Sequence, residues 1–208
     1  MGNQLILKAI LLIPALLLVS CMPKQAAITV DFKSVSPGTS VEKQGKRLPL
    51  VDNGIQLGQQ LPETALVDAV SMQSINLREY KGEVLLLSIV PSIDTKVCET
   101  QTHYLGEEGD TLPPTVKRIT ISRDTPFAQS RFAEEAKLTD IQYLSDYKEG
   151  SFGRSVGLLL DGPRLLARSV IIVDKQGIVR YIQVVPDITH LPDMEKAFSK
   201  AVELAKES

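Results

Sequence analysis

The feature that most constrains this chain is a continuous apolar run, Val84 to Val90 (VLLLSIV), which Gly82 precedes and Pro91 follows. A strand with one face in water alternates apolar and polar residues, whereas a strand covered on both faces is apolar throughout. Glycine and proline at its ends bound the run to a length typical of strands. We therefore expect a central β-strand with layers of protein on both sides.

Strands and helices alternate after this run. We expect further strands over Val116–Ser122, Gln142–Leu144, Arg168–Val173 and Ile178–Val184, the last two joined as a hairpin by Asp174–Gly177. We expect helices over Thr100–Gly109, from Thr125 with Pro126 in the first turn, and over Pro192–Lys206. This order predicts one α/β domain with a mixed sheet.

Composition excludes several classes of protein. The 208 residues are 43% hydrophobic and 23% charged, with a formal net charge of -2, so no basic balance favours nucleic acid. The chain has two cysteines, Cys21 and Cys98, and two histidines, His103 and His190. These are too few for a disulfide framework, or for a zinc site built from cysteine and histidine alone.

The N-terminus reads as a targeting signal. Residues Ala9 to Val19 form an apolar run behind Lys8, and the run is shorter than the roughly 20 residues that cross a bilayer. That length is typical of the apolar region of a signal peptide, which is removed. The alternatives are a membrane anchor or a buried helix, but Pro14 interrupts the run. We assign residues 1–20 to a signal peptide.

The end of this run, Leu18-Val19-Ser20-Cys21, resembles the bacterial lipobox. The resemblance implies cleavage before Cys21, lipidation of its sulfur and a periplasm-facing protein anchored by lipid in a bacterial cell envelope; Met22 favours the outer membrane over the inner by analogy. Residues 21–47 are rich in Lys, Gln, Ser, Gly and Pro and show no period, which predicts a flexible tether. Residues 48–208 then form the folded domain.

Cys98 follows the first buried strand by a short loop and precedes a helix. Unpaired N–H groups and the positive end of the helix dipole favour a thiolate at such a place. Thr95 either caps the helix or directs its hydroxyl to the sulfur, and Asp94 competes for the capping role. A lone cysteine is also often an ordinary buried packing residue.

These residues form the pattern P-x-x-x-T-x-x-C, which resembles the peroxiredoxin active-site motif, and the string PSIDTKVCETQT is similar to the thiol peroxidase branch of that superfamily. The similarity spans roughly residues 48–205. Further similar strings follow in order at Gly58–Pro62, Ser122–Phe132, Leu144–Tyr147, Ser151–Gly153 and Leu166–Val170.

The resemblance implies a thioredoxin-like α/β fold, with a mixed central sheet flanked by helices and an N-terminal β-hairpin. It implies that Cys98 is the peroxidatic cysteine, that Thr95 hydrogen-bonds in its pocket, that Pro91 shields the thiolate and that Arg168 activates it. Taken alone, Arg168 reads as a surface charge at the start of a strand. The implied reaction reduces hydrogen peroxide and organic or lipid hydroperoxides through a Cys98 sulfenic acid, and it requires no metal, haem or other cofactor.

The chain departs from its relatives after Phe132, where Ala133 stands in place of the resolving cysteine. We therefore expect a one-cysteine cycle in which an external thiol, thioredoxin-like or small, reduces the sulfenic acid. The analogy with relatives also implies a homodimer. The alternative function is a non-catalytic thioredoxin-fold lipoprotein or a redox sensor; a disulfide oxidoreductase is disfavoured because the chain has no C-x-x-C.

Overall fold

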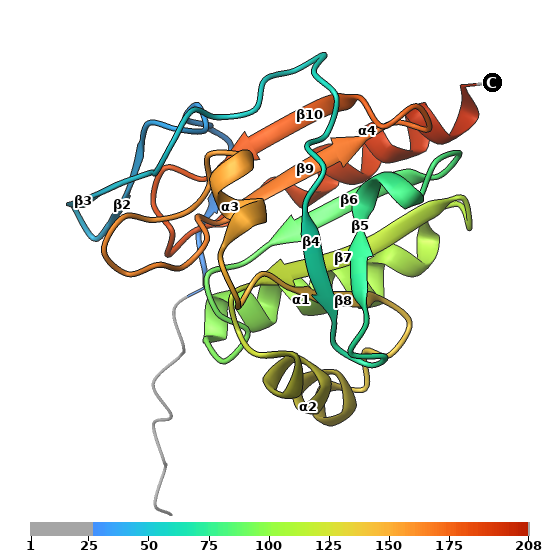
Figure 1. Ribbon diagram of the computed structural model, residues 1–208, viewed down its shortest axis with the longest axis horizontal. Coiled ribbons are helices and arrows are strands. Elements are labelled where there is room, and N and C mark those ends of the chain that lie inside the picture. Colours follow the sequence, from blue (N-terminus) through green and yellow to red (C-terminus); the bar gives the residue numbers. More distant parts are fainter. Residues whose placement is uncertain (1–26, 208) are drawn as a thin grey trace, which may run out of the picture.

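The computed structural model describes residues 27–207, and its centre is a seven-stranded mixed sheet in the order β10-β9-β6-β7-β8-β4-β5 (Figure 1). Its strands are β4 (Ala65–Asp68), β5 (Ser74–Asn76), β6 (Val84–Ile89), β7 (Val116–Ser122), β8 (Gln142–Ser145), β9 (Ser169–Val173) and β10 (Val179–Val184). Strands β6, β7 and β8 are parallel, and the other neighbours pair antiparallel. The predicted mixed sheet is confirmed.

Strand β6 is buried on both faces, as its apolar run predicts. Leu85 and Leu87 pack on one side of the sheet, and Val84 and Leu86 pack on the other. All six residues of the strand are buried. Successive side chains of a strand point to opposite faces, so an uninterrupted apolar run supplies both cores at once.

Helices cover the two faces unequally. On one face lie α1 (Lys96–Glu107) and α4 (Met194–Lys206), which contact the central strands, and α2 (Pro126–Ala136) packs beside β8. The other face is covered by the short α3 (Ser151–Ser155), by the chain that follows it and by N-terminal residues. Two short 3₁₀ turns flank these elements: η1 (Leu77–Glu79) precedes β6, and η2 (Glu108–Thr111) follows α1.

The helix starts and the hairpin follow local signals in the sequence. Thr125 caps α2 by accepting a hydrogen bond from the N–H of Ala128, with Pro126 in the first turn, and Asp193 caps α4. Strands β9 and β10 pair antiparallel around the predicted turn. The Asp174 carboxylate holds that turn by accepting the backbone N–H groups of Gln176 and Ile178.

The predicted flexible tether is wrong for residues 30–47. These residues form β1 (Val30–Asp31), which pairs with β11 (Leu191–Pro192), and most of a hairpin of β2 (Ser40–Lys43) and β3 (Lys46–Pro49). We call residues 29–49 the N-terminal arm. Its strands are short and mostly exposed, so they leave no periodic pattern, yet Val41 is 3% exposed and joins the core. The hairpin that the family resemblance implied is present.

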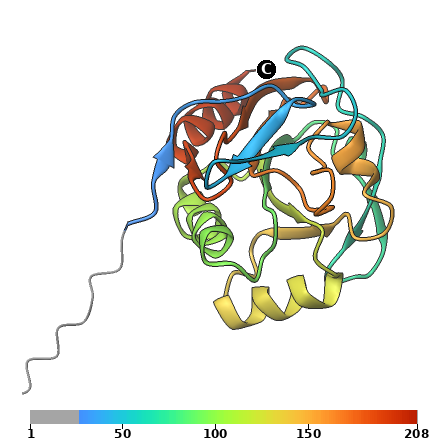
Figure 2. The ribbon, with the colours of Figure 1, turned by 90° about the vertical axis from the view of Figure 1, so that its left-hand side faces the viewer.

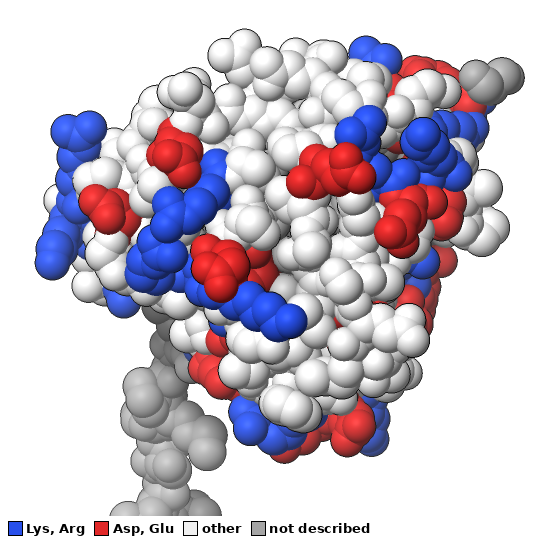
Figure 3. Space-filling view, in the orientation of Figure 1, with Lys and Arg blue, Asp and Glu red and all other residues white. Residues whose placement is uncertain are grey.

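The remaining N-terminal assignments, the signal peptide of residues 1–20 and lipidated Cys21, lie outside the described residues. Within residues 27–207, no helix combines the length and the apolar character needed to span a membrane. On the face shown in Figure 3, acidic and basic side chains are interspersed between broad uncharged areas. That mixture agrees with the small net charge expected from composition.

Candidate active site

Cys98 lies in the first turn of α1, in the helix that follows β6. The helix begins at Lys96, four residues before the predicted start at Thr100, because Thr95 is already its extended N-terminal cap. The first N–H groups of a helix have no partner within the helix and form its positive end. The predicted location at a helix N-terminus is confirmed. Cys98 is 0% exposed, so its side chain is buried at the start of the helix.

Thr95 directs its hydroxyl at the sulfur. Its Oγ1 lies 3.0 Å from Cys98 Sγ and 3.2 Å from the carbonyl oxygen of Ser92, so two acceptors compete for its one proton and the sulfur is the nearer. The side chain caps no N–H of the helix. Of the two alternatives for Thr95, the structure therefore supports the second: its backbone takes the N-terminal cap position, and its hydroxyl points to the sulfur and not to a helix N–H. Asp94, the competing cap, is exposed and pairs with Arg131 at 3.4 Å.

Arg168 reaches the same sulfur from the neighbouring strand. Strand β9 runs antiparallel to β6 with Ser169 opposite Ile89, so the start of β9 lies beside the end of β6. From there Arg168 Nη2 donates to Cys98 Sγ at 3.3 Å. Arg168 is 2% exposed, which excludes the surface charge that the sequence alone suggests.

The other donors of Arg168 are held by protein acceptors. Its Nη1 donates to Gln101 Oε1 at 2.7 Å, and its Nε donates to the carbonyl oxygen of Ile188 at 2.9 Å. Gln101 is itself oriented by donating to Ser88 Oγ at 2.9 Å. Burial lowers the pKa of the Arg168 guanidinium, and the Cys98 sulfur beside it opposes that shift.

Gln101 and Ser88 also belong to this hydrogen-bond network, although the sequence did not predict it. Both are fully buried and polar. Gln101 follows Cys98 by three positions, so the two residues share a helix face, and Ser88 is the one hydroxyl in the apolar run of β6. A buried polar group needs a partner, so a serine inside that run is a usable signal.

Asp124 holds the loop that precedes Cys98, and the sequence analysis missed this role too. Its carboxylate accepts hydrogen bonds from Ser92 Oγ at 2.8 Å, from the N–H of Ile93 at 2.7 Å and from Ser122 Oγ at 2.7 Å. Because Asp124 follows β7, it joins the ends of the two central strands. The loop that carries Thr95 is therefore held to the sheet by hydrogen bonds to Asp124.

Two further residues singled out in the sequence, Pro91 and Ala133, are also buried. Pro91 is buried two residues after the end of β6, at the start of the loop. Ala133 is 5% exposed in α2 and belongs to the same apolar cluster as Cys98. Cys98 is a free thiol and the only cysteine of residues 27–207. Alanine at position 133 supplies no sulfur for a disulfide.

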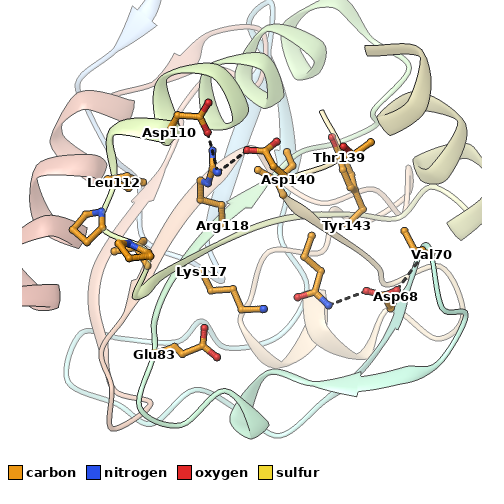
Figure 4. Close-up of a pocket in the computed structure, with 16 residues that line it drawn as sticks. Asp68, Val70, Glu83, Asp110, Leu112, Lys117, Arg118, Thr139, Asp140 and Tyr143 are labelled. Atoms are coloured by element: carbon orange, nitrogen blue, oxygen red, sulfur yellow. Dashed lines mark hydrogen bonds and ion pairs between the residues drawn. The ribbon is translucent and has the colours of Figure 1, made fainter. Parts of the chain in front are cut away.

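A hollow of about 700 Å³ lies at the end of the sheet opposite Cys98, where β6 and β7 begin (Figure 4). Three of its charged groups pair with one another: Arg118 bridges Asp110 at 3.2 Å and Asp140 at 2.6 Å. Elsewhere, His103 pairs with Glu107 and His190 with Asp31. Across residues 27–207, no group of three or more His, Cys, Asp or Glu side chains is arranged to hold a metal ion.

The arrangement around Cys98 suits a reactive thiolate. A helix N-terminus, the Thr95 hydroxyl and the Arg168 guanidinium all place positive potential at one buried sulfur. The same donors lie where negative charge develops on an atom that the sulfur attacks. The site can therefore both stabilise a nucleophile and assist the departure of an anionic leaving group.

Comparison with known proteins agrees with this geometry. The model of the Redoxin family matches residues 56–198. The thiol peroxidase of Halalkalibacterium halodurans is 37% identical over 162 residues, covering 78% of this chain and 96% of that protein. The thiol peroxidase of Bacillus subtilis is 37% identical over 163 residues with the same coverage.

Solved structures of other proteins share the fold of this chain. A peroxiredoxin-like protein from Aquifex aeolicus superimposes with a TM-score of 0.76 at 32% identity, covering 82% of this chain and 99% of that one. A thiol peroxidase from Chromobacterium violaceum, at 20% identity, shares the fold with a TM-score of 0.67 over 79% of this chain and 98% of its own. Cys98 and Arg168 both lie within residues 56–198, which the Redoxin family model matches.

Proposed function

The chain belongs to the Redoxin family, within its thiol peroxidases, and from this premise we propose how its thiol-dependent peroxidase cycle proceeds at Cys98. The observation that carries the proposal is the convergence of Thr95 Oγ1 and Arg168 Nη2 on one buried sulfur. The non-catalytic alternative is not favoured, because relatives that match along nearly their whole length are thiol peroxidases.

In the oxidative step, the Cys98 thiolate attacks the terminal oxygen of a hydroperoxide. An S–O bond forms and the O–O bond breaks, so the sulfur is oxidised by two electrons and the peroxide is reduced. The electron pair of the broken bond leaves on the other oxygen, the one bonded to the organic group or to the second hydrogen, and that oxygen takes up a proton to become an alcohol or water. Arg168 and Thr95 stabilise the negative charge as it moves from the sulfur to that oxygen.

In the reductive step, an external thiol attacks the Cys98 sulfenic acid. An S–S bond forms, water leaves, and a second thiol then releases Cys98 by exchange, so two thiols or one dithiol are oxidised per peroxide. The proposal is supported by Ala133 in α2 and by the absence of any second cysteine in residues 27–207. The reductant is a thioredoxin-like protein or a small thiol.

Two measurements test this cycle. Replacement Cys98→Ser should abolish peroxide consumption in the presence of thiols, and retained turnover would refute the role of Cys98. Mass spectrometry of the peroxide-treated protein should find a Cys98 sulfenic acid that dimedone traps, or a mixed disulfide with the added thiol. A disulfide between Cys98 and another residue of the same chain would refute the one-cysteine cycle.

The proposal extends to the membrane and to assembly. We place the enzyme on the periplasmic side of a bacterial cell envelope, anchored through lipidated Cys21 and at the outer membrane in preference to the inner. The intact mass of detergent-extracted protein should equal the chain from Cys21 plus its acyl groups, and Cys21→Ser should lose them. A homodimer is expected from relatives, and sedimentation analysis would detect a monomer if that expectation is wrong.

A further inference from the structure

The N-terminal arm reaches the catalytic guanidinium through a single residue, Ile188. The carbonyl oxygen of Ile188 accepts from Arg168 Nε at 2.9 Å. The N–H of Ile188 donates to the carbonyl oxygen of Glu42 in β2, also at 2.9 Å. Both backbone polar groups of this residue are thus used, one to hold Arg168 and one to attach to the hairpin.

Asp187 sets the turn in which Ile188 lies. Its carboxylate accepts from the N–H of Thr189 at 2.9 Å, from Thr189 Oγ1 at 2.7 Å and, in the hairpin, from the N–H of Gln44 at 3.3 Å. Burial alone would raise the pKa of Asp187, but these hydrogen bonds outweigh it and hold the pKa below its usual value. The carboxylate therefore closes the turn around Ile188 and also ties that turn to the arm.

Strand β1 holds the other end of the same turn. The N–H of Leu191 donates to the carbonyl oxygen of Thr29 at 2.8 Å, and His190 pairs with Asp31 at 3.4 Å. Figure 2 shows β1 beside α4 and the hairpin lying across the chain that follows β10. The turn is consequently fixed on two sides by residues far from it in the sequence.

The position of the Ile188 carbonyl matters because a guanidinium is a rigid, planar fork. Arg168 donates to Ile188, Gln101 and Cys98 from three different nitrogens. A shift of one acceptor rotates the whole group and moves Nη2 relative to the sulfur. Misplacement of a reacting group by about 1 Å can slow a reaction about 100-fold.

We propose that Asp187 is a positioning residue of the peroxidase site, which holds Arg168 on Cys98 through the backbone carbonyl of Ile188. The inference rests on the proposed function and assigns to the N-terminal arm a role in catalysis. The hydrogen-bond partners of the Asp187 carboxylate are Thr189 and Gln44, and neither the Cys98 sulfur nor the Arg168 guanidinium is among them. The effect of Asp187 therefore passes through Arg168 and vanishes when Arg168 is absent.

The test compares Asp187→Leu with Asp187→Asn by quenched flow, with peroxide oxidation of Cys98 read by dimedone trapping and mass spectrometry. Leucine removes the acceptor, and we expect oxidation to slow about 100-fold. Asparagine keeps an amide oxygen for Thr189, so this conservative change should restore most of the rate. Asp174→Leu, which removes a similar turn-holding carboxylate at the opposite end of β9, should leave the rate unchanged and controls for general destabilisation.

A double-mutant cycle separates positioning from a merely structural effect. With Arg168→Met as background, Asp187→Leu should cause no further loss, because the group on which it acts is gone. Additive losses, or a wild-type rate in folded Asp187→Leu, would overturn the inference.

If Asp187→Leu does not fold, the milder pair Thr189→Val and Thr189→Ser gives the same comparison. Slowing is expected only for valine, and valine should cause no further slowing in the Arg168→Met background. If the wild-type protein itself reacts like an ordinary free thiol, the proposed function has failed instead.

Discussion

The guanidinium of Arg168 lies 3.3 Å from the sulfur of Cys98, although 70 positions separate the two residues in the chain. Both side chains are buried, and the pair forms because β9 runs antiparallel beside β6. A buried guanidinium is costly without partners, so the Cys98 sulfur and the other acceptors of Arg168 stabilise it inside the protein.

Arg168→Lys should slow oxidation of Cys98 by peroxide about 100- to 1000-fold. Lysine keeps a positive charge, but a compact ammonium cannot hold Ile188, Gln101 and Cys98 with the geometry of a planar fork. The rate is measured by quenched flow with dimedone trapping. A lysine variant as fast as wild type would show that charge alone suffices at this position.

Thr95→Val should slow the same step about 10- to 100-fold, because a hydrogen bond to a charged group contributes about 1.5–3 kcal/mol. Thr95→Ser is the matched control, since it keeps the hydroxyl that donates to the sulfur at 3.0 Å. The two variants are compared at one peroxide concentration and pH. Equal rates for valine and serine would assign Thr95 to helix capping alone.

Asp124→Ala should expose the buried thiol. Without this carboxylate, Ser92 and the N–H of Ile93 lose the partner that fastens the loop, so Cys98 should react faster with a bulky thiol reagent and more slowly with peroxide. Asp94→Ala is the control, because Asp94 lies in the same loop but pairs only at the surface with Arg131. Unchanged labelling of Asp124→Ala would mean that other contacts fasten the loop.

Asp174→Asn should lower the free energy of unfolding by about 1–3 kcal/mol near pH 7. Burial alone would raise the pKa of Asp174, but hydrogen bonds from Ile178, Arg180 and Gln176 hold it below its ordinary value of 3.8. A lowered pKa in the folded state means that the carboxylate contributes stability above about pH 3.8, which is lost as the pH falls through the folded-state pKa.

Urea unfolding of wild type and Asp174→Asn should therefore give curves that differ near pH 7 and approach each other below about pH 3.8. Asp161→Asn, at an exposed position, should match wild type within about 0.5 kcal/mol at both pH values. A gap between the curves that stays constant with pH would show that lost packing, and not the carboxylate charge, causes the effect.

The central strand, the capped helices and the β9–β10 hairpin could be predicted because their signals are local. An apolar run specifies a strand buried on both faces, and Thr125-Pro126 specifies a helix start, without reference to distant residues. The position of Cys98 after that strand and near a helix start is equally local. Each of these patterns lies within a few consecutive residues, so it can be recognised without knowledge of the tertiary structure.

The sequence by itself thus determined the layers of the fold and the place of Cys98 within them. Only the tertiary structure decided that Arg168 is buried against the sulfur, that Gln101 and Asp124 hydrogen-bond beside it, and that residues 30–47 contain strands. The physical reason is that strand order and register bring these groups together, and backbone hydrogen bonds between distant segments leave no pattern in the side chains of either one.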